Sequence, residues 1–440
     1  MERILVTAYA VNPYKGSEDG TGWNLVNQIA RFQKAIVVTR ENNRKPIEQY
    51  IKENNVTFAR NLEFVYYDLP YYLRFWKRGN KGALLYFYLW QLFLPLMIRK
   101  RKIEFDIAHH LNFHNDWTPT FLWLLGKPLV WGPIGHHPKM PLNFVKQYGF
   151  AAWLKDRATW LVKILFWNLD PFLRLSLIKS EAILAVNSSE KLVHSRFADK
   201  ITVMPAVASD KAILSTKPKT GFNILSVGRF VALKGFDVTI KSFAKFYCSL
   251  PVLSRVDVKL TLVGKGPEKS RLKKIAIEVG IDHAINWIEW VDKADMQRIY
   301  QEADAFLFPS HEGAGMVIPE ALSFGLPILC FDNFGPGELT DDTCAIRVAC
   351  GKYETAITDF ADGLNKLFYD QNLRNEMARN AYKKWSEELN WETKGNVFQK
   401  IYADISAKKA WIIHENTNTS VSYQTQMRSC HMLVESEFQR

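Results

Sequence analysis

The stretch FLFPSHEGAGMVIPEAL, residues 306–322, contains the unit from which the fold is inferred. Its apolar start is typical of a buried strand, its glycines and small residues of a loop, and its end of a helix. Two glutamates, Glu312 in the loop and Glu320 in the helix, follow a Glu-x7-Glu spacing. A unit of this kind indicates a parallel sheet covered by helices on both faces.

The order of strand, loop and helix recurs through the chain. In the first half, apolar runs expected to form strands occur at residues 3–9, 35–39, 62–68, 106–110, 128–132 and 182–187. In the second half they occur at residues 222–228, 258–264, 284–290, 305–309 and 327–331. A chain of 440 residues is long enough for two domains of roughly 200 residues each. We therefore predict an α/β fold with two Rossmann-like, doubly wound domains facing across a cleft.

Composition shifts indicate where these domains end. A polar, Lys-containing stretch follows residue 205, and the chain beyond residue 411 is rich in Ser, Thr, Asn and Gln without periodicity. The prediction is a first domain at 1–205, a linker at 206–220, a second domain at 221–388, a helix at 389–410 that packs back on the first domain, and a disordered tail at 411–440.

The composition is that of a globular protein, with 48% hydrophobic residues and mixed charges. Five cysteines are scattered without metal-ligand spacing, which indicates reduced thiols and no structural zinc. The opening residues MERILVTAYA do not resemble a secretory signal, so we expect a cytoplasmic protein. The net charge of +12 indicates an anionic partner: nucleic acid, a nucleotide or an acidic membrane face.

Part of the positive charge lies in two aromatic, apolar segments, residues 71–103 and 143–180, which we expect to be helical and to face a membrane. The apolar run 83–98 is shorter than the ~20 residues of a spanning helix and contains Pro95. A helix lying on an anionic bilayer, with the basic residues 99–102 at the phosphates, is one interpretation. A buried helix with a basic end is the other. The second segment favours peripheral contact with the inner face of the cytoplasmic membrane, and basic residues beside long apolar runs argue against nucleic acid.

The stretch SVGRFVALKGFD, residues 226–237, places two cations where a predicted strand ends. Arg229 and Lys234 follow Gly228 and precede a helix. Cations at the carboxyl edge of a parallel sheet, beside a helix N-terminus, suit a diphosphate. The alternative is that both are solvated surface cations. A second glycine turn, at Gly264, brings backbone N–H groups to the same edge.

The loop and helix of 306–322 suit a sugar and a nucleotide at that edge. The N–H groups of Gly315, Met316 and Val317 would open the helix as an anion-binding site. Glu320 can accept hydrogen bonds from vicinal hydroxyls such as those of ribose, and Glu312 from the hydroxyls of a sugar. The alternative for each glutamate is charge complementarity at a helix N-terminus, worth about 0.3–1 kcal/mol.

The segment from Gly228 to Lys234, followed by the Glu312 and Glu320 pair within PSHEGAGMVIPEAL, resembles the retaining GT-B glycosyltransferases. This large family, glycosyltransferase group 1, includes relatives of sucrose and glycogen synthases and bacterial capsule, exopolysaccharide and lipid mannosyl enzymes. The resemblance runs through about residues 222–345. It is looser in the first half, through residues 12–23 and 110–135.

The resemblance implies a UDP-, GDP- or ADP-sugar as donor, bound mainly by the second domain, with no cofactor and no metal ligand. The catalytic residues it implies are Glu312, Arg229, Lys234 and His110. The donor-binding residues it implies are Gly16, Gly20, Gly22, Gly228, Gly264, Trp290, Val291, Gly315, Met316, Val317 and Glu320. In this interpretation the base meets main-chain groups near Trp290 and Val291, and a loop from Gly16 to Gly22 closes over the phosphates and sugar.

A histidine after the 106–110 strand would contact the sugar near its C6 hydroxyl. His109, His110 and His114 compete for this role, and the spacing to Pro119 favours His110. The alternative is a histidine paired in the core. The first loop also departs from the family, in which adjacent glycines are usual.

The reaction implied by the resemblance is transfer of a hexose with retention of anomeric configuration. The acceptor would be a lipid-linked or growing surface-polysaccharide glycan. The absence of an Asp-x-Asp stretch suits a reaction without a metal, and fixed cations would stabilise the leaving phosphate. The alternatives are a nucleotide-sugar epimerase, a phosphorylase, or a non-catalytic sugar-nucleotide-binding protein on the same scaffold.

Overall fold

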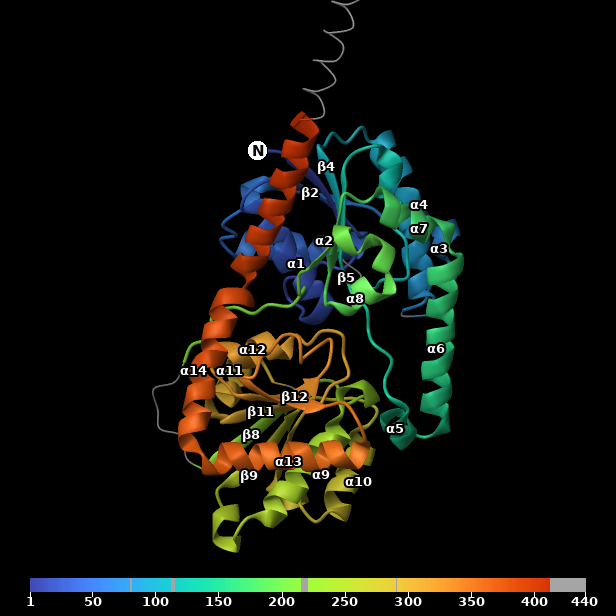
Figure 1. Ribbon diagram of the computed structural model, residues 1–440. Coiled ribbons are helices and arrows are strands. Elements are labelled where there is room, and N and C mark those ends of the chain that lie inside the picture. The colour runs from blue at the N-terminus through green and yellow to red at the C-terminus, as the bar shows by residue number, and fades with distance from the viewer. Residues whose placement is uncertain (80, 112–114, 215–220, 290, 412–440) are drawn as a thin grey trace, which may run out of the picture. The chain divides into compact units, whose positions relative to one another are not determined.

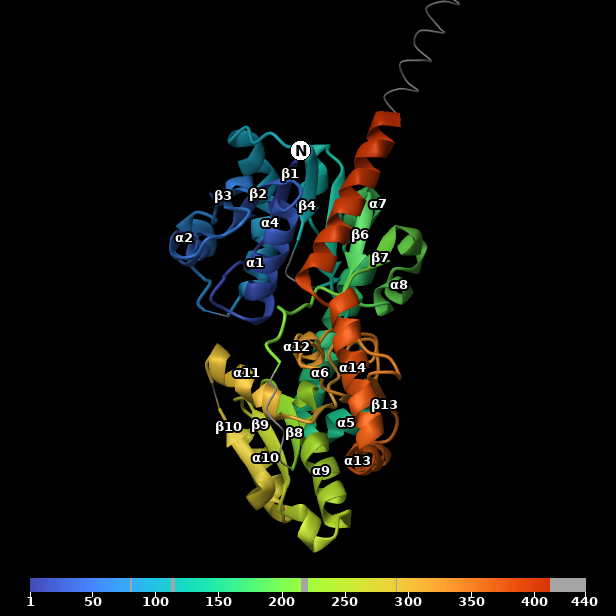
Figure 2. The same ribbon diagram turned by 90° about the vertical axis from the view of Figure 1, so that its left-hand side faces the viewer.

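The structure is a computed structural model that describes residues 1–79, 81–111, 115–214, 221–289 and 291–411 (Figure 1). Residues 1–395 form one compact unit. In both views the strands form two separate groups (Figures 1 and 2). Part of the predicted linker 206–220 and almost all of the predicted tail 411–440 lie outside the described residues.

The first group is a seven-stranded parallel sheet with strand order β3-β2-β1-β4-β5-β6-β7. Its strands are β1 Arg3–Thr7, β2 Lys34–Thr39, β3 Leu62–Tyr66, β4 Ile107–His110, β5 Leu129–Ile134, β6 Ala182–Ala185 and β7 Ile201–Val203. The helices that follow in this half of the chain are α1 Ser17–Ala30, α2 Arg44–Glu53, α3 Tyr71–Arg74, α4 Ala83–Lys100, α5 Leu142–Val145, α6 Phe150–Leu169, α7 Pro171–Lys179 and α8 Ser189–Val193.

The second group is a six-stranded parallel sheet with strand order β10-β9-β8-β11-β12-β13. Its strands are β8 Phe222–Val227, β9 Val258–Val263, β10 Ile285–Ile288, β11 Ala305–Phe308, β12 Ile328–Asp332 and β13 Ala345–Ala349. Its helices are α9 Phe236–Ser249, α10 Lys269–Glu278, α11 Lys293–Glu302, α12 Val317–Ser323, α13 Tyr353–Tyr369 and α14 Gln371–Glu388. A further helix begins at residue 391, where Arg31 donates a hydrogen bond to the carbonyl of Glu392 at 3.4 Å, and it continues to residue 411.

Both strand orders reverse direction beside the first strand of the domain, as in doubly wound nucleotide-binding folds. Two apolar cores cover the two faces of the second sheet, one with α9, α10 and α13 and one with α11, α12 and α14. Strands buried on both faces are nearly continuous apolar runs, which is why they were recognisable in the sequence. The predicted pair of Rossmann-like α/β domains is confirmed.

Helix α4 is largely buried, which bears on the two interpretations of residues 71–103. Tyr86, Phe87, Trp90 and Leu94 pack in one core with residues of β1, β2 and β4. At its basic end, the Arg99 guanidinium donates a hydrogen bond to the carbonyl of Leu124. The observed α4 is therefore the buried helix with a basic end, and the interpretation of the whole segment as a helix lying on a bilayer does not fit it.

Residues 140–148 leave the first sheet and pack into the core of the second domain; we call them the strap. Met140, Phe144 and Val145 lie in the same apolar cluster as Phe331 and Tyr353. The strap ends in a polar contact, because the hydroxyl of Tyr148 donates a hydrogen bond to the buried carboxylate of Asp237, which Tyr353 also contacts. Helix α6 starts immediately after the strap.

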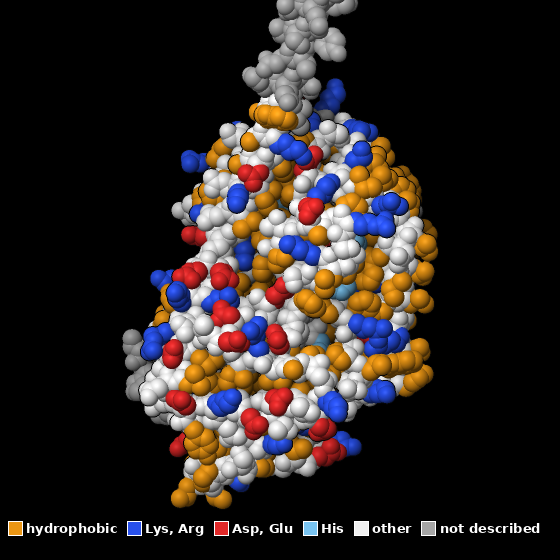
Figure 3. All heavy atoms as spheres, in the orientation of Figure 1, with side chains coloured by type: hydrophobic (Ala, Val, Ile, Leu, Met, Phe, Trp, Pro, Cys, Tyr) orange, Lys and Arg blue, Asp and Glu red, His pale blue; other side chains and the backbone are white. Residues whose placement is uncertain are grey.

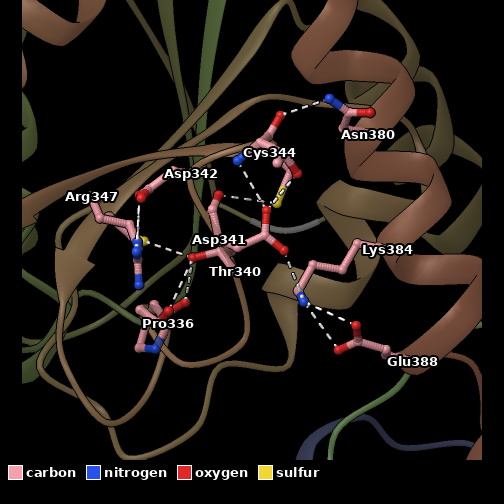
Figure 4. A network of polar contacts seen from close by, with 12 residues as sticks. Pro336, Thr340, Asp341, Asp342, Cys344, Arg347, Asn380, Lys384 and Glu388 are labelled. Atoms are coloured by element: carbon pink, nitrogen blue, oxygen red, sulfur yellow. Dashed lines mark hydrogen bonds and ion pairs between the residues drawn. The ribbon is translucent and has the colours of Figure 1, made fainter.

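The loop after β12 is held by a polar network (Figure 4). Lys384 of α14 contacts the carboxylates of Asp341 at 3.1 Å and Glu388 at 3.0 Å. Thr340 donates a hydrogen bond to the carbonyl of Pro336 at 3.0 Å. These contacts hold the loop that follows β12 against α14.

Candidate active site

A cleft of about 680 Å³ runs along the carboxyl edges of the strands. This is where parallel sheets place ligands. Eight of the predicted residues line it: Gly16, Arg229, Lys234, Glu312, Gly315, Met316, Val317 and Glu320. The cleft is thus bordered by the turns after β8 and β11 and by the beginning of α1.

Lys234 and Glu312 form an ion pair inside the cleft. The ammonium nitrogen Nζ lies 2.6 Å from Oε2 of Glu312, and both side chains are largely buried. The same Nζ lies 4.9 Å from the centre of the Phe308 ring. Lys234 comes from the turn after β8 and Glu312 from the loop after β11, and these strands are neighbours in the sheet. The ion pair therefore places one cation and one carboxylate at adjacent strand ends.

Arg229 supplies a second cation to the cleft. It follows Gly228 at the end of β8, and its side chain is exposed. Within the described part of the chain its guanidinium forms no ion pair. A solvated, unpaired guanidinium costs little to redirect toward an anionic ligand, because no existing contact must be broken.

Glu320 lies on α12, and a hydrogen bond from a side chain of α11 holds its carboxylate in place. Oε2 accepts a hydrogen bond of 2.9 Å from the hydroxyl of Tyr300, whose ring stacks on Phe324 at 5.0 Å. Burial raises the pKa of Glu320, and the Tyr300 hydrogen bond opposes that shift. Glu320 lines the cleft, where a carboxylate can accept hydrogen bonds from the hydroxyl groups of a ligand.

Gly228 and Gly264 do not line the cleft but shape the edge beneath it. A Cβ atom at position 264 would collide with the carbonyl oxygen of Gly228. The turns after β8 and β9 can therefore approach each other this closely only with glycine at 264. Both glycines affect the cleft indirectly, because they set the course of the backbone that carries Arg229.

The first-domain wall differs from the prediction. Helix α1 begins at Ser17, so residues 17–22 are helical and the expected loop from Gly16 to Gly22 is wrong. Gly20 and Gly22 are buried inside the helix, and only Gly16 reaches the cleft. The glycines suggested a loop, but the packing of α1 on the sheet overrides their low helix propensity. Thr21 of this helix contacts the Met316 sulfur at 3.5 Å, across the cleft.

His110, the favoured histidine, lies at the end of β4 away from the cleft lining. Its Nδ1 is 3.4 Å from the Thr7 hydroxyl, and its ring packs against Phe87. His109 is also buried, with Nε2 2.7 Å from the carbonyl of Gly132, and burial lowers its pKa to about 4. His114 lies outside the described residues. His109 and His110 are thus histidines paired in the core, which was the alternative interpretation.

The histidine that lines the cleft is His137, which the sequence reasoning missed. Its Nδ1 accepts a hydrogen bond of 3.1 Å from the N–H of Gly313. Desolvation and then Lys163 lower its pKa, so the ring is neutral and its proton lies on Nε2. A neutral imidazole held this way can donate a hydrogen bond to a ligand hydroxyl. The repeated His-His after β5 was the only signal for it.

Asn187 fixes the same glycine loop from the other side. Its side-chain amide donates hydrogen bonds to the carbonyls of His136 at 2.9 Å and Gly313 at 2.6 Å. Nearby, the N–H of Ser188 binds both carboxylate oxygens of Glu338, at 3.1 and 3.0 Å. A Cβ at position 313 would collide with the His136 carbonyl, so this approach also requires glycine. The two walls of the cleft meet through these contacts.

The residues predicted for the base are less informative. Val291 follows β10 and packs partly against the core of the second domain. Trp290 lies outside the described residues. The assignment of both to base binding stays a prediction.

Comparison with known families agrees with this geometry. Residues 211–384 match the family described as glycosyl transferases group 1. The lipopolysaccharide core biosynthesis glycosyltransferase LpsE of Rhizobium meliloti is 31% identical over 178 residues, which are 40% of this chain and 48% of LpsE. An uncharacterized glycosyltransferase of Haemophilus influenzae is 31% identical over 166 residues, 35% of this chain and 45% of that protein. The chain spans about half the length of the curated relatives it matches.

Solved structures extend the likeness to both domains. WaaG, a glycosyltransferase involved in lipopolysaccharide biosynthesis, superposes with a TM-score of 0.58 at 16% identity, over 90% of this chain and 98% of WaaG. HepE of Anabaena, solved with UDP, gives 0.59 at 14% identity, over 92% and 100%. Sucrose-phosphate synthase of Thermosynechococcus elongatus gives 0.62 at 15% identity, over 93% and 100%. Residues 211–384 are a domain of the glycosyl transferases group 1 family, within a chain that has the two-domain GT-B fold.

Proposed function

We propose that this protein transfers a hexose from a nucleotide-diphosphate sugar to an acceptor, with retention of anomeric configuration and without a metal ion at the diphosphate. The observation that carries the proposal is the convergence of Lys234, Glu312 and Glu320 on one cleft at the carboxyl edge of the second sheet. The cations that would bind a diphosphate and the carboxylates that would bind hydroxyl groups then lie close enough together for one ligand to contact both.

The diphosphate would be bound by Lys234 and Arg229. Each charge-assisted hydrogen bond to a phosphate oxygen contributes about 1.5–3 kcal/mol when partly buried. Lys234 has three N–H donors, so it can keep Glu312 and still reach a phosphate. The ion pair then serves to hold Lys234 in position before the donor arrives.

Glu320 would bind the ribose, and Glu312 with the backbone of Gly315–Val317 would bind the transferred sugar. A carboxylate accepts but does not donate hydrogen bonds, which suits vicinal hydroxyls. His137 would add a donor from the opposite wall through its Nε2 proton. The expected main-chain contacts of Val291 and Trp290 with the base complete this binding mode.

In the reaction, the bond between the anomeric carbon and the β-phosphate oxygen breaks, and the acceptor oxygen bonds to that carbon on the same face. The acceptor's proton passes to the departing phosphate. The negative charge that develops on the leaving group is stabilised by Lys234, which Glu312 holds in position before the donor arrives, and by Arg229, which turns toward the diphosphate. Neither glutamate has to act as an acid or base in this scheme.

We further propose a lipid-linked or surface-polysaccharide acceptor reached at the inner face of the cytoplasmic membrane. Helix α6 supports this, because its outer side exposes Phe150, Leu154, Leu161, Leu165 and Leu169. Figure 3 shows hydrophobic and basic side chains over this helix. In the described residues no helix is long and apolar enough to cross a bilayer, so the contact would be with the surface.

The test is calorimetric binding of UDP, GDP and ADP, each with and without added magnesium, followed by turnover with the matching nucleotide sugar. We expect one nucleotide to bind with micromolar affinity irrespective of magnesium, and the anomeric proton coupling of the product to match that of the donor. Binding without turnover would favour a non-catalytic sugar-nucleotide-binding protein. Conversion of the sugar without an acceptor would favour an epimerase. Failure of all three nucleotides to bind would reject the proposal.

A further inference from the structure

A second cluster of polar side chains lies in the interior behind the first-domain wall of the cleft. Asp116 comes from the loop after β4, His136 from the loop after β5, and Glu190 from α8. One ligand-type atom from each lies within 4.8 Å of the other two. Asp116 and Glu190 are fully buried and His136 is 6% exposed. We call these three residues the Asp116 cluster.

Too few partners surround the carboxylates of this cluster. His136 Nδ1 lies 2.9 Å from Oδ2 of Asp116, but Oδ1 of Asp116 and both oxygens of Glu190 accept no hydrogen bond from the described residues. His194 Nε2 approaches Oε1 of Glu190 to 3.3 Å without donating a hydrogen bond to it. Lys163 is buried nearby but forms no ion pair with either carboxylate in the described structure. Buried, unpaired carboxylate oxygens are costly unless a cation or a proton joins them.

We propose that Asp116, His136 and Glu190 bind a divalent transition-metal ion, of which zinc is the best fit. Zinc takes imidazole nitrogen and carboxylate oxygen at about 2.0–2.2 Å in tetrahedral sites, so its ligand atoms lie about 3.3–3.6 Å apart. The ligand atoms of the cluster lie within 4.8 Å of one another, so a bound ion would draw them closer together. Magnesium fits worse, since it prefers oxygen ligands and keeps several waters.

His194 is placed to orient the ligands from outside. Its Nε2 lies 3.3 Å from Oε1 of Glu190 and 3.5 Å from the carbonyl oxygen of Asp116. An imidazole N–H in this position can donate to Glu190 once that carboxylate turns toward the ion, as outer partners of metal sites do.

The ion would hold the cleft wall together rather than touch the donor. Asn115 and His137, the chain neighbours of Asp116 and His136, line the cleft. Asn187, three residues before Glu190, binds the carbonyl of Gly313. Three segments far apart in the sequence are thereby joined at one point. The inference depends only on the first domain, and it stands or falls separately from the proposed transfer reaction.

The direct test is metal analysis of the purified full chain, followed by titration of the chelator-treated protein with zinc, manganese or magnesium chloride. We expect about one zinc per chain and a higher Tm with zinc than with magnesium.

Variants locate the site. Glu190→Gln and His136→Gln should weaken zinc binding at least tenfold, whereas His283→Gln, an exposed histidine of the second domain, should leave it unchanged. The Tm of each metal-free variant shows whether it folds, and if a cluster variant does not fold, the zinc content of the wild-type chain decides. Absence of stoichiometric zinc in the wild type, or unchanged affinity in folded Glu190→Gln, would overturn the proposal.

Discussion

Lys234 and Glu312 are bonded at 2.6 Å although they come from turns after two different strands, β8 and β11. The sequence indicated both residues separately, as a phosphate cation and a sugar-binding carboxylate. The ion pair makes them interdependent, because removing either charge leaves the other partly buried without its partner.

Lys234→Ala should weaken the binding of a nucleoside diphosphate such as UDP about tenfold to hundredfold, equivalent to ~1.5–3 kcal/mol for one lost charge-assisted contact. Binding of the corresponding nucleoside, which carries no phosphate, should change far less. Calorimetry with both ligands separates these effects. Lys265→Ala is the matched control, because Lys265 lies after β9 on the same sheet edge but outside the cleft lining. Equal losses for nucleoside and nucleotide would argue against diphosphate binding by Lys234.

Tyr300→Phe should shift the pH dependence of donor binding. The Tyr300 hydroxyl stabilises the ionised Glu320 carboxylate, so its loss raises the pKa of Glu320 further. Ribose binding needs the carboxylate, and affinity falls as pH drops through that pKa. In the variant the fall should begin at a higher pH, while affinity at alkaline pH stays close to that of the wild type. Nucleotide titrations across the acidic range measure this, with the exposed Tyr369→Phe as control. Superimposable pH profiles would remove Glu320 from the ribose site.

His137→Ala should lower kcat/KM for transfer about tenfold to hundredfold, as expected for one hydrogen bond of ~1.4–2.8 kcal/mol to the sugar. Affinity for the free nucleotide diphosphate, which lacks the sugar, should hardly change. Steady-state kinetics and nucleotide calorimetry on the same preparation distinguish the two. His110→Ala tests the residue that the sequence favoured. Since His110 is outside the cleft lining, its variant should act through stability, visible as a lower Tm with nearly unchanged KM.

Replacing Leu161 and Leu165 by glutamate should release the protein from anionic liposomes in sedimentation assays. Both side chains are exposed on α6, so the change removes apolar area from the bilayer contact and adds repulsion from the lipid charge. The folded core should not be affected. Leu253→Glu, at an exposed leucine of the second domain, is the control. If the double variant still sediments with the liposomes, α6 is not the surface that contacts the membrane.

Asp341→Asn should destabilise the protein by about 1 kcal/mol near neutral pH, a modest value because the Asp341 pairing is partly solvated. Although burial raises its pKa, hydrogen bonds from Thr343 and Lys384 lower the pKa of Asp341 to about 2. A lowered folded-state pKa stabilises the fold above the unfolded value near 4, and this stabilisation is lost as pH falls toward 2. The difference between variant and wild type should therefore shrink on acidification. Denaturant unfolding measures this difference. Asp342→Asn is the control, and it should destabilise the protein less because the Asp342 carboxylate is more exposed.

The fold could be predicted from the sequence because the pattern that indicates each element lies in consecutive residues. Each strand of the second sheet is an apolar run, a glycine follows β8 and β9 directly, and the segment from Gly228 to Lys234 could be placed at a sheet edge by that pattern alone. The Glu312 and Glu320 spacing likewise put both carboxylates at the same edge. Local spacing was sufficient for these residues, since strand, turn and helix are consecutive.

What the sequence did not reveal depends on contacts between distant segments. The start of α1 at Ser17 and the burial of α4 are decided by packing on the sheet, which overrides glycine propensity and surface-like composition. His137 was missed because its partner, Gly313, is in the other domain. Asp116, His136 and Glu190 are so far apart in the sequence that no spacing motif could join them.

The strap has a consequence for any attempt to divide this protein. A fragment beginning at the predicted linker would contain every strand of the second sheet but would lack Met140, Phe144 and Val145. Their loss would leave Phe331 and Tyr353 uncovered and Asp237 without Tyr148. Chimeras that exchange the second domain between such chains should therefore carry residues 140–148 with the second half, although these residues belong to the first half of the gene.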